Sequence, residues 1–383
     1  MENVSKSQQK NLPLLDSVLD YYSNIRFQLT ALIVCHHILE SNLFLIDYLI
    51  RLGIKPKDIF VIGKSYSTSP QMIKHYLAYG ITLHRNSLAF DSHMSFDEQF
   101  KTSIRDFLRE IQKRDLSKYE KIIVLDDGGE LLAQVHDAFQ GDSRIAGVEQ
   151  TASGYHKLRL LSPLFPVINV ATSWAKLEYE SPFIAESFVK ELYKRLNQMD
   201  KKIETILILG NGMIGSNIAS ILKGDCRVFV YDSHIERSEL SKEELNNILP
   251  VCDAIIGCSG QISMIEPYYS KVKKGVIFAS ASSSDREFES YKIRRSHEKT
   301  SNPHKDFYTD HIILLNAGFP LNFDGDKLSV SLDKIQLTLA LMLAGAIQTV
   351  CASGRKGILE LDVNVQNVLI RKFNEIISAR SYT

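Results

Sequence analysis

The sequence has no excess of charge of either sign, because 45 Lys and Arg residues balance 45 Asp and Glu residues in 383. Nucleic-acid binding and attraction to anionic membranes both draw on excess positive charge, so neither partner is expected. The densest apolar run, 337–347, is shorter than the ~20 residues of a membrane span. The opening residues also lack the apolar centre of a signal peptide. We therefore expect a cytoplasmic protein.

Cysteine is scarce as well, with five residues that are widely spaced and form no CxxC pair: Cys35, Cys226, Cys252, Cys258 and Cys351. This pattern excludes a disulfide framework and a structural zinc site, and we predict no metal site. The composition that remains, 44% hydrophobic and 23% charged, is typical of a globular protein. At ~100–200 residues per domain, the length predicts two domains.

Short β-branched runs alternate with longer helical patterns, which predicts an α/β fold with parallel sheets. The expected strands are 29–35, 58–63 and 121–126 in one series, then 205–209, 227–231, 254–257, 276–279 and 312–315 in another. Each series predicts a doubly wound, Rossmann-like domain. We interpret 296–310 as an irregular excursion and expect two closing helices, 332–350 and 363–379, to return to the first domain. The predicted domains are thus 1–190 with 325–383, a discontinuous substrate domain, and 200–322, a dinucleotide-binding domain.

A glycine loop follows the first strand of the second series. Gly210, Gly212 and Gly215 have the GxGxxG spacing, and a helix pattern containing Met213 and Ile214 begins within it. Such a loop permits a tight turn, close approach to a diphosphate and a free helix amino terminus. Asp232, which ends the next strand, would accept hydrogen bonds from a ribose and repel a 2′-phosphate, so we predict NAD as the cofactor. The alternatives are flavin, S-adenosylmethionine or a glycine turn without a ligand.

Six segments together resemble adenosylhomocysteinase, the NAD-dependent hydrolase of S-adenosylhomocysteine. They are 35–53, 125–132, 147–158, 168–183, the glycine loop and 314–323, in the family's order along the chain. The resemblance implies transient oxidation of a ribose 3′-hydroxyl by NAD, elimination of a thiol, addition of water and reduction of the ketone. It also implies a site in the cleft between two domains, and we expect a homodimer or higher homo-oligomer.

The resemblance implies roles for four catalytic residues. His37 matches the family's catalytic histidine, and an imidazole can donate or accept a proton near neutral pH. Asp127, in the turn 125–132, is the expected partner of His37, although paired acids before glycines are also ordinary in turns. Lys176 matches the lysine that takes the hydroxyl proton, with Glu180 four residues on as its partner. A solvated ion pair is the alternative for these two.

The resemblance also implies binding residues. Thr151, Ser153 and Asn322 match residues that hold the nicotinamide ribose and carboxamide, and Gln150, Ser67 and Thr68 are assigned to the substrate.

Several positions depart from the family's pattern. Leu39 and Ser41 replace the adenine-binding threonine and glutamate, and Gln150 replaces a ribose-binding glutamate. Ser283 and Ser329 stand where two histidines are expected. Because each buried polar contact is worth ~1–3 kcal/mol, these changes weaken adenosine recognition.

Three hypotheses follow. The first is an NAD-dependent hydrolase or oxidoreductase of one-carbon-metabolism type that oxidises a small, nucleoside- or sugar-like substrate other than S-adenosylhomocysteine. The second is a catalytically silent NAD-binding relative with a regulatory or scaffold role. The third is a genuine S-adenosylhomocysteine hydrolase with altered contacts.

Overall fold

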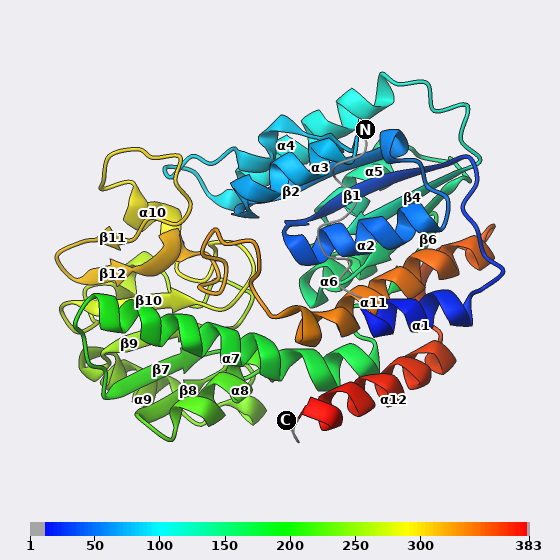
Figure 1. The fold of residues 1–383 in the computed structure, drawn as a ribbon. Coiled ribbons are helices and arrows are strands. Elements are labelled where there is room, and N and C mark those ends of the chain that lie inside the picture. The colour runs from blue at the N-terminus through cyan, green and yellow to red at the C-terminus, as the bar shows by residue number, and fades with distance from the viewer. Residues whose placement is uncertain (1–11, 381–383) are drawn as a thin grey trace.

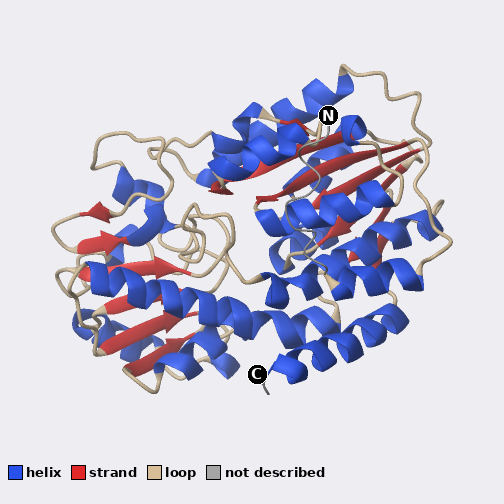
Figure 2. Ribbon diagram, in the orientation of Figure 1, coloured by secondary structure: helices blue, strands red, loops and turns tan. Residues whose placement is uncertain are grey.

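The computed structural model describes residues 12–380, which form two α/β units, each built on its own mainly parallel sheet (Figure 1; Figure 2). This confirms the predicted fold class. The first unit also includes the end of the chain, because the last helices lie against the first sheet.

The first sheet has seven parallel strands. Their spatial order is β13 (Gly357–Glu360), β6 (Pro166–Asn169), β5 (Ile145–Glu149), β4 (Lys121–Asp126), β1 (Thr30–Ile38), β2 (Ile59–Thr68) and β3 (Thr82–Leu83). Alternate residues of β1 point to opposite faces: Leu32 and Val34 join one apolar cluster, and Ile33 and Cys35 join another. This period of two is the reason that both faces are covered by helices.

The second sheet has six strands. Their order is β11 (Phe307–Tyr308), β12 (Ile312–Leu314), β10 (Val276–Ser280), β9 (Ala254–Gly257), β7 (Thr205–Leu209) and β8 (Arg227–Tyr231). All pairs are parallel except β11 with β12. The excursion expected at 296–310 therefore contains a short edge strand, which the sequence analysis overlooked because two residues are too few to show a pattern.

Twelve α-helices connect and cover the strands within the described residues. They are α1 (Pro13–Tyr21), α2 (Glu40–Arg51), α3 (Pro70–Ala78), α4 (Phe96–Gln112), α5 (Glu130–Ala138), α6 (Ala152–Leu161), α7 (Trp174–Gln198), α8 (Met213–Leu222), α9 (Lys242–Ile248), α10 (Ser290–Arg294), α11 (Leu332–Gln348) and α12 (Val363–Arg380). Helices α1, α2, α3, α11 and α12 pack on one face of the first sheet, and α4, α5 and α6 pack on the other.

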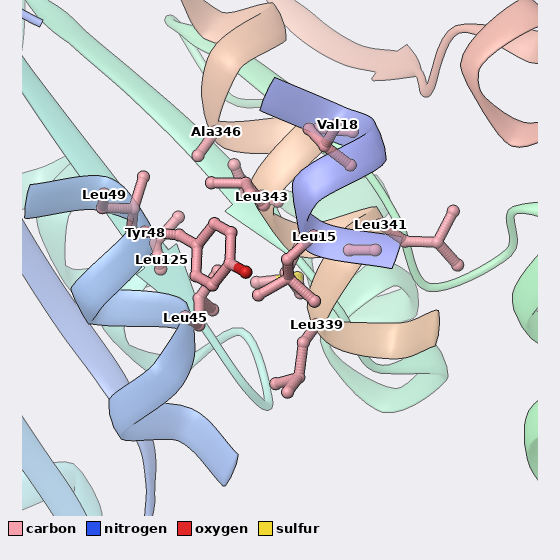
Figure 3. Close-up of a cluster of buried hydrophobic side chains, with 14 of the residues drawn as sticks. Leu15, Val18, Leu45, Tyr48, Leu49, Leu125, Leu339, Leu341, Leu343 and Ala346 are labelled. Atoms are coloured by element: carbon pink, nitrogen blue, oxygen red, sulfur yellow. The ribbon is translucent and has the colours of Figure 1, made fainter. Parts of the chain in front are cut away.

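The core beneath α11 is almost entirely aliphatic (Figure 3). Leucines of α11 meet residues of α1, α2 and β4, and the hydroxyl of Tyr48 donates a 2.6 Å hydrogen bond to Asp16 at its border.

Helix α11 and the turn after it, Leu332–Ala352, form a 21-residue segment that is long and apolar enough to cross a membrane, although most of it is buried inside the protein. This corrects the shorter run counted from the sequence. Two polar residues, Gln336 and Thr349, interrupt the apolar sequence. Both are buried and donate hydrogen bonds to backbone carbonyls, which is typical of a helix in the interior of a protein, and the segment is the central helix of the first unit.

Helix α7 passes from one unit to the other (Figure 1). Its residues Ala185, Phe188 and Leu192 belong to the apolar cluster of the second sheet, together with α8. Tyr179 and Phe183, nearer its start, contact Phe373 of α12. The domain boundary that we drew from the sequence at residue 190 thus falls within a continuous helix.

Candidate functional site

The order of strands in the first sheet creates a switch point at β1. The chain moves from β1 to β2 on one side and later returns to β4 on the other. In open α/β sheets, ligands bind at the carboxyl ends of strands at such a point. His37 lies near the end of β1 and Asp127 directly follows β4, so the topology itself brings these two residues together.

The imidazole Nε2 of His37 lies 3.2 Å from the carboxylate Oδ2 of Asp127. The hydroxyl of Ser67 meets the other ring nitrogen, Nδ1. A carboxylate accepts hydrogen bonds and donates none, so this geometry places a proton on Nε2. The side chain of Asn42 donates to the His37 carbonyl at 2.9 Å and fixes the strand end.

The neighbouring His36 points to the opposite face and contacts the Tyr76 hydroxyl at 3.2 Å. Burial lowers the pKa of His36 to about 3, so this ring is neutral. It is a core residue.

Lys64, which the sequence analysis overlooked, completes this cluster. Its ammonium is buried, only 4% exposed, and pairs with Oδ1 of Asp127. Burial would lower the pKa of Lys64, but the Asp127 charge outweighs it and raises the pKa above its ordinary value. Burial likewise opposes ionisation of Asp127, whereas Lys64 and His37 hold its pKa well below the usual range. Lys64 and Asp127 are therefore both ionised. The one signal in the sequence was a lysine directly following the apolar run 59–63.

Two further buried carboxyl groups lie on adjacent strands. Asp126 and Glu149 are register partners on β4 and β5, and one oxygen of each is buried without a hydrogen-bond partner among the described residues. Burial is the main cause that raises the pKa of Asp126 to about 6 and that of Glu149 to about 8; the charge of Asp127 adds to the shift of Asp126, and the charge of Asp126 adds to that of Glu149. At neutral pH Glu149 is a neutral acid beside the ionised Asp127.

The expected substrate residues fall at different places. The Gln150 amide donates to Oδ2 of Asp127, and Ser67 contacts His37, so both lie at the cluster. Thr68 does not present its hydroxyl in this way, because the hydroxyl donates to the Lys64 carbonyl at 2.8 Å.

Of the residues expected to hold the nicotinamide end, Thr151 caps α6. Its hydroxyl donates to Glu149 at 2.6 Å and accepts from the backbone of Gly154 at 3.0 Å. Ser153 is half-buried on the first turn of α6.

Lys176 and Glu180 lie on the first turns of α7 and form a 2.6 Å ion pair. The pair is largely covered, with side-chain exposures of 12% and 17%. Thr338 of α11 donates to the second carboxylate oxygen at 2.7 Å. A solvated surface pair, the alternative considered from the sequence, does not match this burial.

The second sheet has its own switch point, because the chain moves from β7 to β8 on one side and then to β9 on the other. Gly210 directly follows β7 with φ +108°, and a Cβ there would lie 2.6 Å from the backbone nitrogen of Ser259. A Cβ on Gly215 would lie 2.0 Å from the carbonyl oxygen of Gly210. These positions admit only glycine, whereas Gly212 faces open space at the amino end of α8.

Asp232 completes this loop from the end of β8. Its carboxylate accepts from the backbone nitrogens of Asn211, at 2.6 Å, and His234, at 2.9 Å. These hydrogen bonds outweigh burial and lower its pKa, so Asp232 is ionised. Met213 is exposed and Ile214 is half-buried against the second core. An open glycine, a free helix end and a fixed acid together make a cradle that suits a dinucleotide.

The loop 316–323 connects the end of β10 with the His37 cluster. Leu321 donates to the carbonyl of Ser280 at 2.9 Å, which holds Asn322 beside the end of β10. The next residue, Phe323, places its ring 4.5 Å from the imidazole of His37. Asn316 organises the turn, since its amide donates to the carbonyls of Pro320 and Phe323, both at 2.9 Å.

The positions that depart from the family's pattern are placed as follows. Leu39 and Ser41 are buried at the start of α2, Ser283 is exposed, and Ser329 accepts at its carbonyl a 2.6 Å hydrogen bond from Ser187 of α7.

No protein-family model matches the sequence. Adenosylhomocysteinases are distantly similar: that of Sulfolobus acidocaldarius is 24% identical over 181 residues, 44% of this chain and 43% of that protein. The NAD⁺-bound 3-phosphoglycerate dehydrogenase of Entamoeba histolytica aligns over 84% of this chain and 94% of its own, with 13% identity and a TM-score of 0.43.

A closer relative is the uncharacterized protein Rv0104 of Mycobacterium tuberculosis (strain H37Rv). It is 35% identical over 341 residues, which are 88% of this chain and 67% of that protein. The chain belongs to the same family as Rv0104.

Proposed function

We propose that the protein is an NAD-dependent enzyme related to adenosylhomocysteinase, which transiently oxidises a hydroxyl of a nucleoside- or sugar-like substrate other than S-adenosylhomocysteine. The observation that carries this proposal is that each of the two sheets places candidate binding or catalytic groups at its switch point. The glycine cradle occupies one switch point and the pair of His37 and Asp127 occupies the other, while the loop that holds Asn322 beside the end of β10 also places Phe323 against His37.

The residues of the cradle fit NAD. Gly212 and the first turn of α8 would hold the diphosphate, and Asp232 would accept hydrogen bonds from the adenosine ribose. Asn322 and Ser153 would hold the nicotinamide end. When bound, NAD supplies a hydride acceptor for the substrate hydroxyl.

The chain's own residues would move the protons. Lys176, held by Glu180, takes the proton of the hydroxyl that is oxidised. His37 accepts or donates a proton at Nδ1, and Asp127 orients the ring. The aromatic rings of Tyr66, Phe319 and Phe323 cover this region and exclude water from a reactive ketone.

A substrate other than S-adenosylhomocysteine is supported by what replaces the adenine contacts. Leu39 offers no hydrogen bond. Gln150 is occupied by Asp127 and is neutral, so it does not serve as a base for a ribose hydroxyl.

A silent NAD-binding relative with a regulatory or scaffold role is the second candidate. The contact between the rings of Phe323 and His37 favours it, because the imidazole is covered. Turnover of a substrate would support the enzyme, and binding of NAD without turnover would support the silent relative. Hydrolysis of S-adenosylhomocysteine is the third outcome of the same assay.

The test begins with mass spectrometry of ligands released from the native protein, where we expect NAD. The holoenzyme is then screened with nucleosides, thioether sugars and polyols for a change in nicotinamide absorbance. We expect Lys176→Ala to lower the rate at least 100-fold, and Lys190→Ala, an exposed lysine of the same helix, to leave it unchanged. Absence of NAD binding would contradict the whole proposal. NAD binding without turnover of any substrate would leave the silent relative.

The proposal includes two domains, 1–190 with 325–383 and 200–322, a cytoplasmic location and a homodimer or higher homo-oligomer. Light scattering of the purified protein measures the assembly, and a monomer would contradict it.

A further inference from the structure

Lys64 is a lysine in an unusual place, because it lies within the β2 strand of a seven-stranded sheet and its ammonium is buried. An unpaired ammonium in such a position would be strongly unfavourable. Its partner is Asp127, whose other oxygen contacts both Nε2 of His37 and the amide of Gln150. One carboxylate is thus shared by a permanent cation, an imidazole and an amide.

This sharing changes what Asp127 does to His37. A lone buried carboxylate attracts a proton to a neighbouring imidazole, whereas a carboxylate already neutralised by a lysine attracts it much less. Nε2 of His37 faces the shared carboxylate of Asp127, and Nδ1 contacts the Ser67 hydroxyl.

The other groups around His37 do not replace Lys64 in this role. His36 on the same strand is neutral, and Tyr66 and Phe323 contribute uncharged rings. Asp126 and Glu149, at the neighbouring strand ends, have pKa values of about 6 and about 8, respectively. Both are acids, so neither supplies the positive charge that Lys64 supplies.

We propose that Lys64 is a positioning residue that neutralises Asp127 and thereby weakens the attraction of that carboxylate for a second proton on His37. The proposal relies on the proposed function only in making His37 the group that exchanges protons with a substrate. The arrangement of charges itself is tested without any substrate.

The experiment follows the titration of His37 by NMR in the full chain, with its histidines labelled with carbon-13. The His37 signal is assigned as the one that is missing from His37→Gln. We expect Lys64→Met to move the proton uptake of the His37–Asp127 pair to higher pH by ~1–3 units. Lys118→Met is the control, since it removes an exposed lysine of the same unit that pairs with another aspartate, Asp58, at 3.7 Å. The control should leave the titration of His37 unchanged.

An unshifted titration in Lys64→Met would overturn the proposal. Should that variant fail to fold, a second pair carries the test, because Lys64→Met/Asp127→Asn removes both charges together. His37 in this double variant should take up its proton at about the same pH as in the wild-type protein, because the two removed charges cancel in the wild type. A titration at clearly lower pH would show that Lys64 does not neutralise Asp127 and would overturn the proposal. Where turnover is found, the acidic limb of kcat/KM should move with the NMR titration. Absence of turnover would count against the proposed function but not against the role of Lys64.

Discussion

At the scale of single residues, Asp126, Asp127 and Glu149 show how position separates three similar groups. All three are buried at the ends of adjacent strands. Asp127 is paired with Lys64 and stays ionised, whereas burial keeps Glu149 protonated near neutral pH. At neutral pH one cation therefore lies near two ionised carboxylates, Asp127 and Asp126, and Glu149 remains beside them as a neutral acid. Two negative charges against one positive charge disfavour an anion at this place.

The raised pKa of Glu149 predicts a pH-dependent stability. Glutamate in an unfolded chain has a pKa of ~4.3, whereas Glu149 in the fold has a pKa of about 8. The folded state therefore holds a proton that the unfolded state releases. Its stabilisation is complete below pH ~4.3 and is lost as the pH rises through about 8. Over that window the free energy of unfolding should fall by up to ~1.4 kcal/mol per pH unit.

Urea unfolding at pH 5.5 and pH 8 measures this effect. Glu149→Gln, which does not ionise, should show a much smaller decrease between the two pH values. Glu204→Gln, at an exposed position, should behave like the wild-type protein. Equal decreases in wild type and Glu149→Gln would show that Glu149 does not bind the proton.

His37 and Asp127 could be predicted from the sequence, because both lie at the ends of predicted strands and both match residues of the family they resemble. Lys64 could not, because a lysine after an apolar run is normally exposed and nothing local shows that it is buried. Its partner lies 63 residues away along the chain, so only the assembled sheet identifies the pair.

At the scale of elements, the sequence predicted strands best where β-branched residues were continuous. Lys121–Asp126, Thr205–Leu209 and Arg227–Tyr231 have the bounds that the pattern predicted. The strand Ile145–Glu149 was overlooked because alanine and glycine occupy its centre, and Pro166–Asn169 because it begins with proline. These strands are specified by their neighbours in the sheet more than by their own residues.

The glycine loop predicts two distinct effects of adding one methyl group. In Gly215→Ala the new Cβ would meet the carbonyl of Gly210 at 2.0 Å, so the helix must shift from the strand and the protein should lose ~1–3 kcal/mol of stability. In Gly212→Ala the Cβ enters open space and the backbone has φ −77°, so stability should change little. The same methyl group would obstruct a diphosphate, and NAD affinity should fall at least tenfold.

Thermal unfolding and NAD titration of both variants separate the two roles. Gly224→Ala, where an added Cβ would meet only a carbonyl at 3.7 Å, is the control for an alanine near this helix. Unchanged NAD affinity in Gly212→Ala would place the dinucleotide elsewhere.

At the scale of the whole molecule, the two units are joined by a continuous contact rather than by α7 alone. One apolar cluster extends from the face of the first sheet to the second, and it includes Tyr66, Phe96 and Phe319. The rings of Tyr66 and Phe319 stack with centroids 4.6 Å apart. Because Tyr66 also contacts the imidazole of His37, with ring centroids 6.2 Å apart, the contact that joins the units reaches the candidate site.

The centre of this contact is Arg294, whose side chain is fully buried. It pairs with Asp285 at 2.6 Å and donates to the carbonyls of Ser92, at 2.8 Å, and Met94, at 2.9 Å, in the other unit. Asp285 in turn accepts from the backbone nitrogen of Phe96 at 3.1 Å.

Arg294→Leu should therefore destabilise the protein by ~3–5 kcal/mol, because it leaves the Asp285 carboxylate buried without its cation. We expect faster hydrogen exchange at residues 92–97 and a larger radius of gyration in X-ray scattering, as the units separate. Arg294→Leu/Asp285→Asn should recover part of the stability but not the contact with Ser92. Arg295→Leu removes an exposed neighbour with one hydrogen bond to the His93 carbonyl and should change neither measurement appreciably. Unchanged exchange at 92–97 in Arg294→Leu would show that the aromatic rings hold the units together without it.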